Sequence, residues 1–303
     1  MKDNYQHVGL SRFCRLLGIS RQAYYQHFWT QSSISTEQEL VLKEVKRIRS
    51  NHRYLGTRKL YEMIQPFLLE HQIKMGRDAL FDLLADNKML VRRKKRRIYT
   101  TNSFHWLKKY PNLIKDFIPN AINQVWVSDI TYWKINNNYS YISFVTDAYS
   151  HKIVGHHVAE TLEALQSVQA LKMALSGLRG EANNLCHHSD RGIQYCSEEY
   201  TQLLKEYKIK ISMTETGDPL DNAIAERVNG IIKNEYLCNY KVSTIDEARK
   251  ALDFAIKLYN TERPHMSNGN LTPQQIHTDN IKTERLWKNY YKKTSNLVNL
   301  FQD

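Results

Sequence analysis

Three acidic residues stand where carboxylates could hold divalent metal ions. Asp129 lies in a run of β-forming residues from Val125 to Trp133, Asp190 follows a second short β run, and Glu226 lies in a segment with helical spacing. A carboxylate among Val, Trp, Ile and Tyr is costly to bury unless it is paired or bound to metal. Carboxylates are ligands of Mg²⁺, and two ions about 4 Å apart can promote an in-line phosphoryl transfer. Taken alone, each acid is better explained as a surface, capping or turn residue.

The segment around Glu226 supports the metal hypothesis. Asn222, Glu226, Asn229 and Lys233 are spaced i, i+4, i+7 and i+11, so they share one face of the predicted helix. Lys233 lies two turns beyond Glu226, within reach of a phosphate beside bound metal. Asn222, Asn229 and Lys233 are therefore candidate contacts of a DNA backbone.

The elements that must position these residues form an α/β pattern. Three β-rich runs with short links predict an antiparallel meander over 125–133, 139–146 and 152–158. Helices and strands then alternate: helix 161–178, strand 184–188, helix 198–207, strand 209–213 and a helix from about 222 to 236. Three strands followed by alternating helix and strand predict a mixed sheet.

The first thirty residues have the pattern of two short helices joined by a turn. Apolar residues from Leu10 to Leu17 have helical spacing, Gly18 interrupts them, and Ser20 is a good N-cap for a second helix that begins at Arg21. This pattern is typical of a helix-turn-helix, in which Arg21 is a candidate DNA contact. A purely structural αα-hairpin fits equally well.

Three further helices are predicted over 36–50, 57–69 and 77–90, and a run of six cations follows them. Aromatic residues, among them Tyr99 and Trp106, come soon after this run. Basic residues with nearby aromatics suit phosphate contact and base stacking, so DNA contact is favoured over an inert linker. The six candidate DNA-binding residues are Arg92, Arg93, Lys94, Lys95, Arg96 and Arg97.

Charge is unevenly distributed along the chain. The net charge is +12, but residues 1–122 hold 23 Lys and Arg against 10 Asp and Glu, and the remaining residues hold 20 against 21. A basic front end of this kind suits a polyanionic partner. The four cysteines are too few for a disulfide framework, and no apolar run approaches the ~18 residues of a membrane span. A reduced, cytoplasmic protein without a membrane partner is expected.

The spacing and surroundings of the acids resemble a known family. Between Asp129 and Asp190 lie 60 residues, and between Asp190 and Glu226 lie 35. This resembles the D,D-35-E arrangement of retroviral integrases and of the insertion-sequence-three family of bacterial transposases. Trp126 to Tyr132 resembles W-x-x-D-I-T-Y, His188 to Tyr195 resembles H-S-D-R-G-x-Q-Y, Asp221 to Glu226 resembles D-N-A-x-x-E, and Tyr259 to His265 resembles Y-N-x-x-R-P-H. The resemblance covers nearly the whole chain.

The resemblance implies a ribonuclease H-like catalytic core that cuts and rejoins DNA. It implies two Mg²⁺ ions per site, with Mn²⁺ able to substitute, bound by Asp129, Asp190 and Glu226. The implied partners are double-stranded DNA at element ends and target, further copies of the chain, and the first-frame product of the element. The front end resembles a second-frame product, or a member with a reduced front end, and the expected location is the bacterial nucleoid.

The predicted organisation has five parts: a helix-turn-helix-like segment over 1–30, a helical DNA-binding domain over 31–98, a linker over 99–122, the catalytic core over 123–280 and a C-terminal helical tail over 281–303.

Several residues keep alternative interpretations. Cys186, His187, His188 and Cys196 could be zinc ligands, but their spacing fits no common structural zinc site. Asp147 and Asp221 favour capping or turn roles. Arg263 lies in a proline-containing loop that could brace the core or contact DNA.

Two other functions compete with transposition. A tyrosine recombinase would need Arg and His around one nucleophilic Tyr and would not need the acidic residues. A catalytically silent DNA-binding regulator would use the basic front end equally well, but would show no Mg²⁺-dependent nicking.

Overall fold

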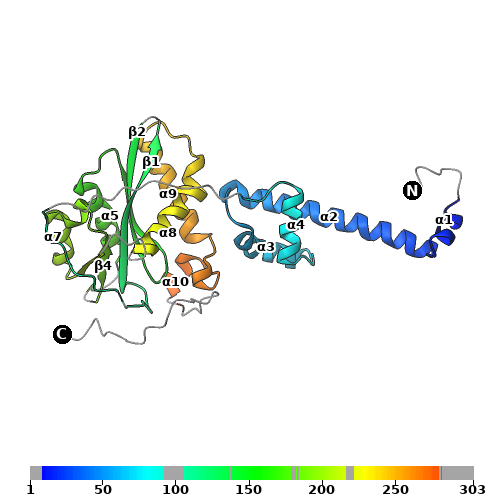
Figure 1. Ribbon diagram of the computed structural model, residues 1–303, viewed down its shortest axis with the longest axis horizontal. Coiled ribbons are helices and arrows are strands. Elements are labelled where there is room, and N and C mark those ends of the chain that lie inside the picture. Colours follow the sequence, from blue (N-terminus) through cyan, green and yellow to red (C-terminus); the bar gives the residue numbers. More distant parts are fainter. Residues whose placement is uncertain are drawn as a thin grey trace. The chain divides into compact units, whose positions relative to one another are not determined.

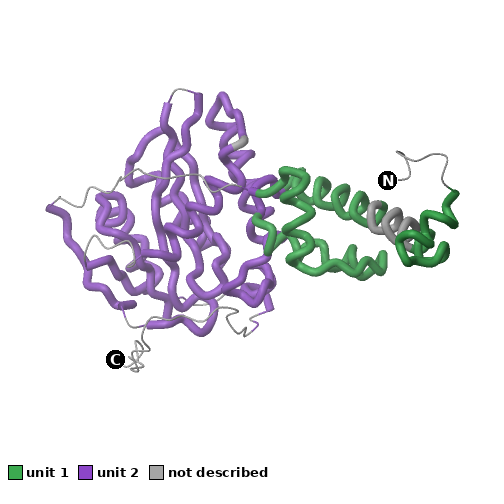
Figure 2. The backbone as a smooth tube through the Cα atoms, turned by 45° about the vertical axis from the view of Figure 1, so that its right-hand side comes forward, with its two compact units in different colours: residues 1–51, 56–90 green, residues 52–55, 91–303 purple. Residues whose placement is uncertain are grey.

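The protein is described by a computed structural model that covers residues 9–91, 106–115, 117–136, 138–178, 182, 184–215, 222–279 and 281, with the backbone alone for 27–35 and 239. The chain divides into two compact units, shown in green and purple in Figure 2. Unit 1 comprises Met1–Asn51 and Gly56–Leu90, and unit 2 comprises His52–Leu55 and Val91–Asp303.

Unit 1 is helical, and one long helix replaces two predicted ones. Its elements are α1 (Leu10–Leu16), α2 (Arg21–Asn51), α3 (Thr57–Glu70) and α4 (Arg77–Asp86). Gly18 turns the chain between α1 and α2 with a φ of +67°, a conformation that favours glycine. Ser20 accepts a hydrogen bond from the N–H of Ala23 at 2.9 Å, as expected of the predicted N-cap.

The prediction that a short helix begins at Arg21 and a separate one begins near Thr36 was wrong. No glycine or proline occurs between Arg21 and Asn51, so nothing interrupts the helix. The boundary predicted at residue 30 therefore falls inside α2. A core of aliphatic residues joins α2 to α3 and α4; its buried members include Val41, Val45, Leu60, Ile64, Leu80 and Leu84. The cations from Arg92 to Arg97 lie outside the described residues.

Unit 2 is built on one five-stranded mixed sheet in the order β3-β2-β1-β4-β5. Figure 1 shows α5 and α7 on one side of this sheet and α8 and α9 on the other. The strands are β1 (Val125–Ile135), β2 (Asn138–Asp147), β3 (Ile153–Ala159), β4 (Cys186–Ser189) and β5 (Lys210–Met213). β1, β2 and β3 pair antiparallel, whereas β4 pairs parallel with both β1 and β5. This order confirms the predicted ribonuclease H-like α/β fold.

Helices cover both faces of this sheet. They are α5 (Ala164–Ser176), α6 (Ile193–Cys196), α7 (Glu198–Glu206), α8 (Ala223–Ile231), a π-helical turn (Ile232–Tyr236), a 3₁₀ turn (Leu237–Asn239), α9 (Ile245–Thr261), a 3₁₀ turn (Met266–Asn268) and α10 (Pro273–Asp279). Alternation along β1 separates two cores, because successive side chains point to opposite faces. Trp126 packs with α5 and α7, whereas Trp133 packs with α8 and α9.

Part of the predicted linker belongs to unit 2 and packs against its core. Leu107 and Tyr110 contact one core, and Leu113, Ile114 and Phe117 contact a second cluster that includes Val125 and Val127. Except for Ile281, the predicted C-terminal tail lies outside the described residues. Among the helices that are described, none is long and apolar enough to cross a membrane.

Candidate active site

The register of two parallel strands brings Asp129 and Asp190 together. β1 pairs with β4 from Val125 opposite Cys186 to Ser128 opposite Ser189. The next residue on β1 is Asp129, and the next residue after β4 is Asp190. Neighbouring strands lie about 4.8 Å apart, so the two carboxylates leave the sheet side by side. Both residues are partly exposed.

The loop after β4 orients the Asp190 carboxylate. Its Oδ1 accepts a hydrogen bond from the N–H of Gly192 at 3.0 Å. The same turn leads into α6, whose Tyr195 and Cys196 are buried beneath it. Asp190 is therefore held by a short turn anchored in the core.

Helix α8 is attached to β1 by two asparagine side chains, and these place Glu226. Asn222 Nδ2 donates to the carbonyl oxygen of Ser128 at 3.0 Å, and Asn229 Nδ2 donates to Asp129 Oδ2 at 2.7 Å. Glu226 lies between these two contacts along the helix and is exposed. The three predicted carboxylates thus come from the middle of β1, from the turn that follows β4 and from helix α8, which packs against β1.

The electrostatics of Asp129 show that the negative charges of this site are close together. The pKa of Asp129 is raised from 3.8 to about 8, first by burial and second by the charge of Asp190. The charge of Glu226 raises the pKa further, whereas hydrogen bonds from Ile130 and Asn229 lower it. Burial, followed by the charge of Asp190, therefore favours the protonated form of Asp129.

The donor set fits a hard divalent cation. All three acids offer oxygen, the ligand type of Mg²⁺. Two more oxygens, Oδ1 of Asn222 and Oδ1 of Asn229, are buried beside them without a hydrogen-bond partner among the described residues. As the side chains are placed, no three His, Cys, Asp or Glu of the described chain lie close enough to hold a metal ion. Three carboxylates brought close together repel one another, and a bound cation would offset that repulsion.

The predicted DNA contacts fall into different environments. Lys233 lies with its Nζ 4.3 Å from the centre of the Tyr132 ring. Asn222 and Asn229 are 6% and 5% exposed and donate to β1, so sequence reasoning placed them on the correct helix face but missed their burial. In unit 1, Arg21 is exposed and lines a shallow surface cleft with Gln22, Tyr25 and Gln26.

The possible zinc ligands are buried and make hydrogen bonds with other residues. His187 Nε2 lies 2.7 Å from Ser128 Oγ and 2.9 Å from the Tyr200 hydroxyl, and burial lowers the pKa of His187 to about 3. His188 Nδ1 is hydrogen-bonded to Ser212 Oγ at 2.8 Å. Burial raises the pKa of Cys186 to about 12, which disfavours the thiolate that zinc requires. These residues form a polar network behind Asp129 that the sequence alone did not indicate.

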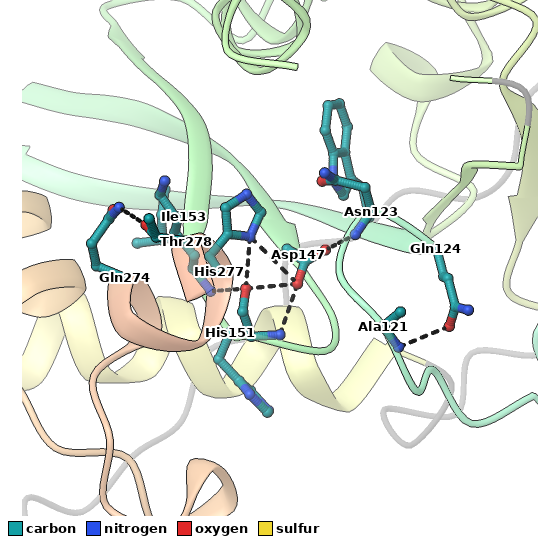
Figure 3. Close-up of polar contacts among 12 residues, drawn as sticks. Ala121, Asn123, Gln124, Asp147, His151, Ile153, Gln274, His277 and Thr278 are labelled. Atoms are coloured by element: carbon teal, nitrogen blue, oxygen red, sulfur yellow. Dashed lines mark hydrogen bonds and ion pairs between the residues drawn. The ribbon is translucent and has the colours of Figure 1, made fainter. Parts of the chain in front are cut away.

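Asp147 and Arg263 both brace the core. Figure 3 shows Asp147 at the end of β2, where its carboxylate accepts hydrogen bonds from the N–H of Asn123 at 2.7 Å and from Ser150 N–H and Oγ at 2.7 and 2.6 Å. His277 of α10 is hydrogen-bonded to the same Ser150 hydroxyl. The turn role predicted for Asp147 is confirmed, whereas Asp221 lies outside the described residues.

Of the two roles considered for Arg263, bracing the core or contacting DNA, the structure supports the first. It is 0% exposed, and its Nε and Nη2 donate to the two carboxylate oxygens of Glu235, each at 2.8 Å. A guanidinium enclosed in this way cannot reach DNA.

Comparison with known proteins adds a family relationship. Two models, each described as an integrase core domain, match residues 119–219 and 207–273. The chain is 37% identical over 267 residues to the insertion element IS600 uncharacterized 31 kDa protein of Shigella sonnei, covering 86% of this chain and 95% of that protein. It is 28% identical to the transposase InsF for insertion sequence IS3A of Escherichia coli (strain K12), covering 90% and 95%. The HTLV-2 integrase catalytic core in complex with magnesium matches 52% of this chain and 96% of its own, at 22% identity and a TM-score of 0.41.

Proposed function

Because this chain belongs to the insertion-sequence-three family as a second-frame transposase, we propose that its DNA cleavage and strand transfer depend on Asp129, Asp190 and Glu226. The chain is a DNA transposase with an integrase core, an enzyme of the nucleotidyl-transferase type. The observation that supports the proposal is the strand register, which puts Asp129 and Asp190 at neighbouring positions, while Asn229 of α8, three residues after Glu226, is hydrogen-bonded to Asp129.

The proposed reaction is two successive phosphoryl transfers. In the first, a water oxygen bonds to a phosphorus at the element end, the P–O3′ bond breaks, and the leaving oxygen takes a proton and becomes a 3′-OH. In the second, that hydroxyl attacks a phosphodiester of the target, whose own leaving oxygen is released. No covalent bond between protein and DNA forms in either step.

The chain's residues divide this work. Asp129 would hold Mg²⁺ from within β1 and Asp190 from the turn after β4, and Glu226 would complete the donor set from α8. When bound, Mg²⁺ supplies positive charge that activates the attacking oxygen and stabilises the leaving one. The amide of Asn229 keeps Oδ2 of Asp129 oriented, because the two atoms are 2.7 Å apart. Lys233, restrained over Tyr132, would bind a phosphate oxygen beside the carboxylates.

The proposed partners are double-stranded DNA, at the element ends and at the target, and further copies of the chain. Transposition joins two ends, so a dimer or a larger assembly is expected. The exposed Arg21 on α2 and the cations from Arg92 to Arg97 would contact DNA, and the first-frame product would be a further partner. The proposed location is the bacterial cytoplasm, on the nucleoid.

Strand transfer in vitro tests the proposal. Wild type and Glu226→Gln are compared on end DNA with Mg²⁺ or Mn²⁺, and we expect the variant to lose about 100-fold or more in rate. Glu206→Gln, the same chemical change at an exposed position of α7, serves as the matched control and should leave the rate unchanged. Equal product from wild type and Glu226→Gln would refute the carboxylate assignment. A silent regulator would bind the same DNA without Mg²⁺-dependent product.

A further inference from the structure

A short segment of unit 2 carries an exposed aromatic ring and two exposed lysines. Trp106 is 92% exposed, and Lys108 and Lys109, which follow it closely, are exposed as well. Neither lysine forms an ion pair with a carboxylate in the part of the chain that the structure describes. An indole ring left almost wholly in water contributes no burial to the stability of the fold. The three side chains are therefore available to a partner.

Apolar residues on either side of the lysines fix this segment to the core of unit 2. Leu107 and Tyr110 pack against the cluster that contains Cys196 of α6. Helix α6 begins three residues after Asp190, so this cluster lies directly after the turn that carries the carboxylate. Lys108 Nζ lies 5.3 Å from the centre of the Tyr110 ring. The lysines are thus displayed on a segment that is itself anchored.

Hydrogen bonds to β5 determine the direction in which the segment runs. The carbonyl oxygen of Pro111 accepts from Met213 N–H at 3.2 Å, and Leu113 N–H donates to Ser212 Oγ at 2.9 Å. Residue numbers rise along the segment as they fall along β5, so the residues before Pro111 continue past the C-terminal end of β5. Strands β4 and β5 are parallel and end side by side, and Asp190 follows β4 at that end. The lysines and Asp190 therefore lie at the same end of the sheet.

The charges beside Asp190 on this side are positive. Arg191 follows Asp190 in the turn and is partly exposed. Burial raises the pKa of the Cys196 thiol to about 11 and the charge of Asp190 raises it too, whereas the charges of Lys109 and Arg191 act to lower it. Two cations from segments far apart in the sequence thus act on the same side chain as the Asp190 carboxylate.

We propose that Trp106, Lys108 and Lys109 bind the DNA strand next to the reacting phosphate. The lysines contact backbone phosphates, and the indole ring stacks on an unpaired base. Within a duplex each base is covered by its neighbours, so an exposed ring can stack only on a base that has left the duplex. The inference rests on the proposed function, which brings the reacting phosphate to Asp190. It adds that the strand beside this phosphate leaves the duplex along the edge of β5.

A double lysine variant tests the phosphate contacts. Lys108→Ala/Lys109→Ala is compared with wild type in EDTA, where binding of a labelled element-end duplex with a single-stranded overhang is followed by fluorescence anisotropy. Between about 50 and 200 mM salt, we expect the slope of log affinity against log salt to become shallower by about 1.8, since each neutralised phosphate contributes about 0.9. The matched control is Lys250→Ala/Lys257→Ala, two exposed lysines of α9, which packs against β3 at the opposite edge of the sheet. This control should keep the wild-type slope.

A tryptophan variant tests the stacking. Trp106→Ala should bind the overhang DNA about tenfold more weakly with an unchanged salt slope, whereas Trp106→Phe should retain most of the affinity. Binding of the corresponding blunt duplex should not change in either variant. All variants should melt at the wild-type temperature, because the altered side chains are exposed.

Three results would overturn the proposal: a wild-type salt slope in Lys108→Ala/Lys109→Ala, wild-type affinity of Trp106→Ala for the overhang DNA, or an equal loss of affinity by Trp106→Ala for overhang and blunt DNA. The proposed function fails by a different result, full strand transfer by Glu226→Gln. The binding measurements are made in EDTA and need no catalysis, so the two failures are distinguishable.

Discussion

Replacing Asp129 with asparagine should remove a pH-dependent loss of stability from the metal-free protein and abolish strand transfer. The reason is that burial and the charge of Asp190 hold the pKa of Asp129 at about 8 in the folded state, against 3.8 ordinarily. Below pH 4 the carboxyl is protonated in both the folded and the unfolded chain, so it contributes nothing. As the pH rises from about 4 to 8, the unfolded chain loses the proton and the folded chain retains it, so the free energy of unfolding falls.

The size of the effect follows from the pKa. Between pH 5 and pH 8 the free energy of unfolding can fall by at most about 4 kcal/mol, at about 1.4 kcal/mol for each pH unit. Asp129 is partly exposed, and solvent and salt screen its charge, so we expect about 1–3 kcal/mol. Both oxygens of Asp129 accept hydrogen bonds, one from Ile130 N–H and one from Asn229 Nδ2. The NH₂ group of an asparagine would have to face one of these donors and lose that hydrogen bond, but this loss of stability is the same at every pH. The pH dependence therefore isolates the charge.

Urea unfolding in EDTA at pH 5, 6, 7 and 8 measures this effect for wild type and Asp129→Asn. As the pH rises, the unfolding free energy of Asp129→Asn should increasingly exceed that of wild type. Mg²⁺ should reduce this difference, because it binds and stabilises the folded wild type. Asp147→Asn is the matched control, because its buried carboxylate accepts three hydrogen bonds and its loss should lower stability throughout. A difference between wild type and Asp129→Asn that stays constant from pH 5 to 8 would refute the reasoning.

Three further predictions concern packing, charge and substrate contact. Gly155→Ala should lower the melting temperature by the equivalent of about 1–3 kcal/mol or more, because its Cβ would clash with the carbonyl oxygen of Ala170 in α5; an unchanged melting temperature would contradict this close approach. Glu235→Gln should lose about 3 kcal/mol in urea unfolding, since it leaves the enclosed Arg263 without its partner, and Arg263→Met in the same chain should recover part of this loss. Tyr132→Leu should slow strand transfer roughly threefold to tenfold while Tyr132→Phe does not, and Tyr132→Leu should add nothing to Lys233→Ala if the ring acts through that lysine.

The sequence predicted the elements of unit 2 more accurately than those of unit 1. The alternation of β-forming residues marked β1, β2 and β3 to within about two residues, because each strand has one face toward each of two cores. In unit 1 a short helix from Arg21 and a separate helix over 36–50 were predicted. No glycine or proline separates the two segments, so α2 continues from one into the other.

The site could be anticipated only in part. The spacing of Glu226 and Asn229 correctly placed them on one helix face, but a polar face does not reveal whether it meets solvent or a neighbouring strand. The burial of Asn229 against Asp129 depends on how α8 crosses β1, which is a tertiary property.

The strand register also determines where residues can be inserted into this chain without moving the acids. The distance between Asp129 and Asp190 is set by the four residue pairs that join β1 to β4, and Glu226 is tied to β1 by side-chain amides on either side of it. The number of residues between the two aspartates is therefore free to vary. Extra residues inserted between α5 and β4 should extend the surface and leave the acids in place, whereas one residue added within β4 would shift Asp190 out of line. The connection after α5 is thus a natural point at which to add a tag or a targeting module without altering the chemistry.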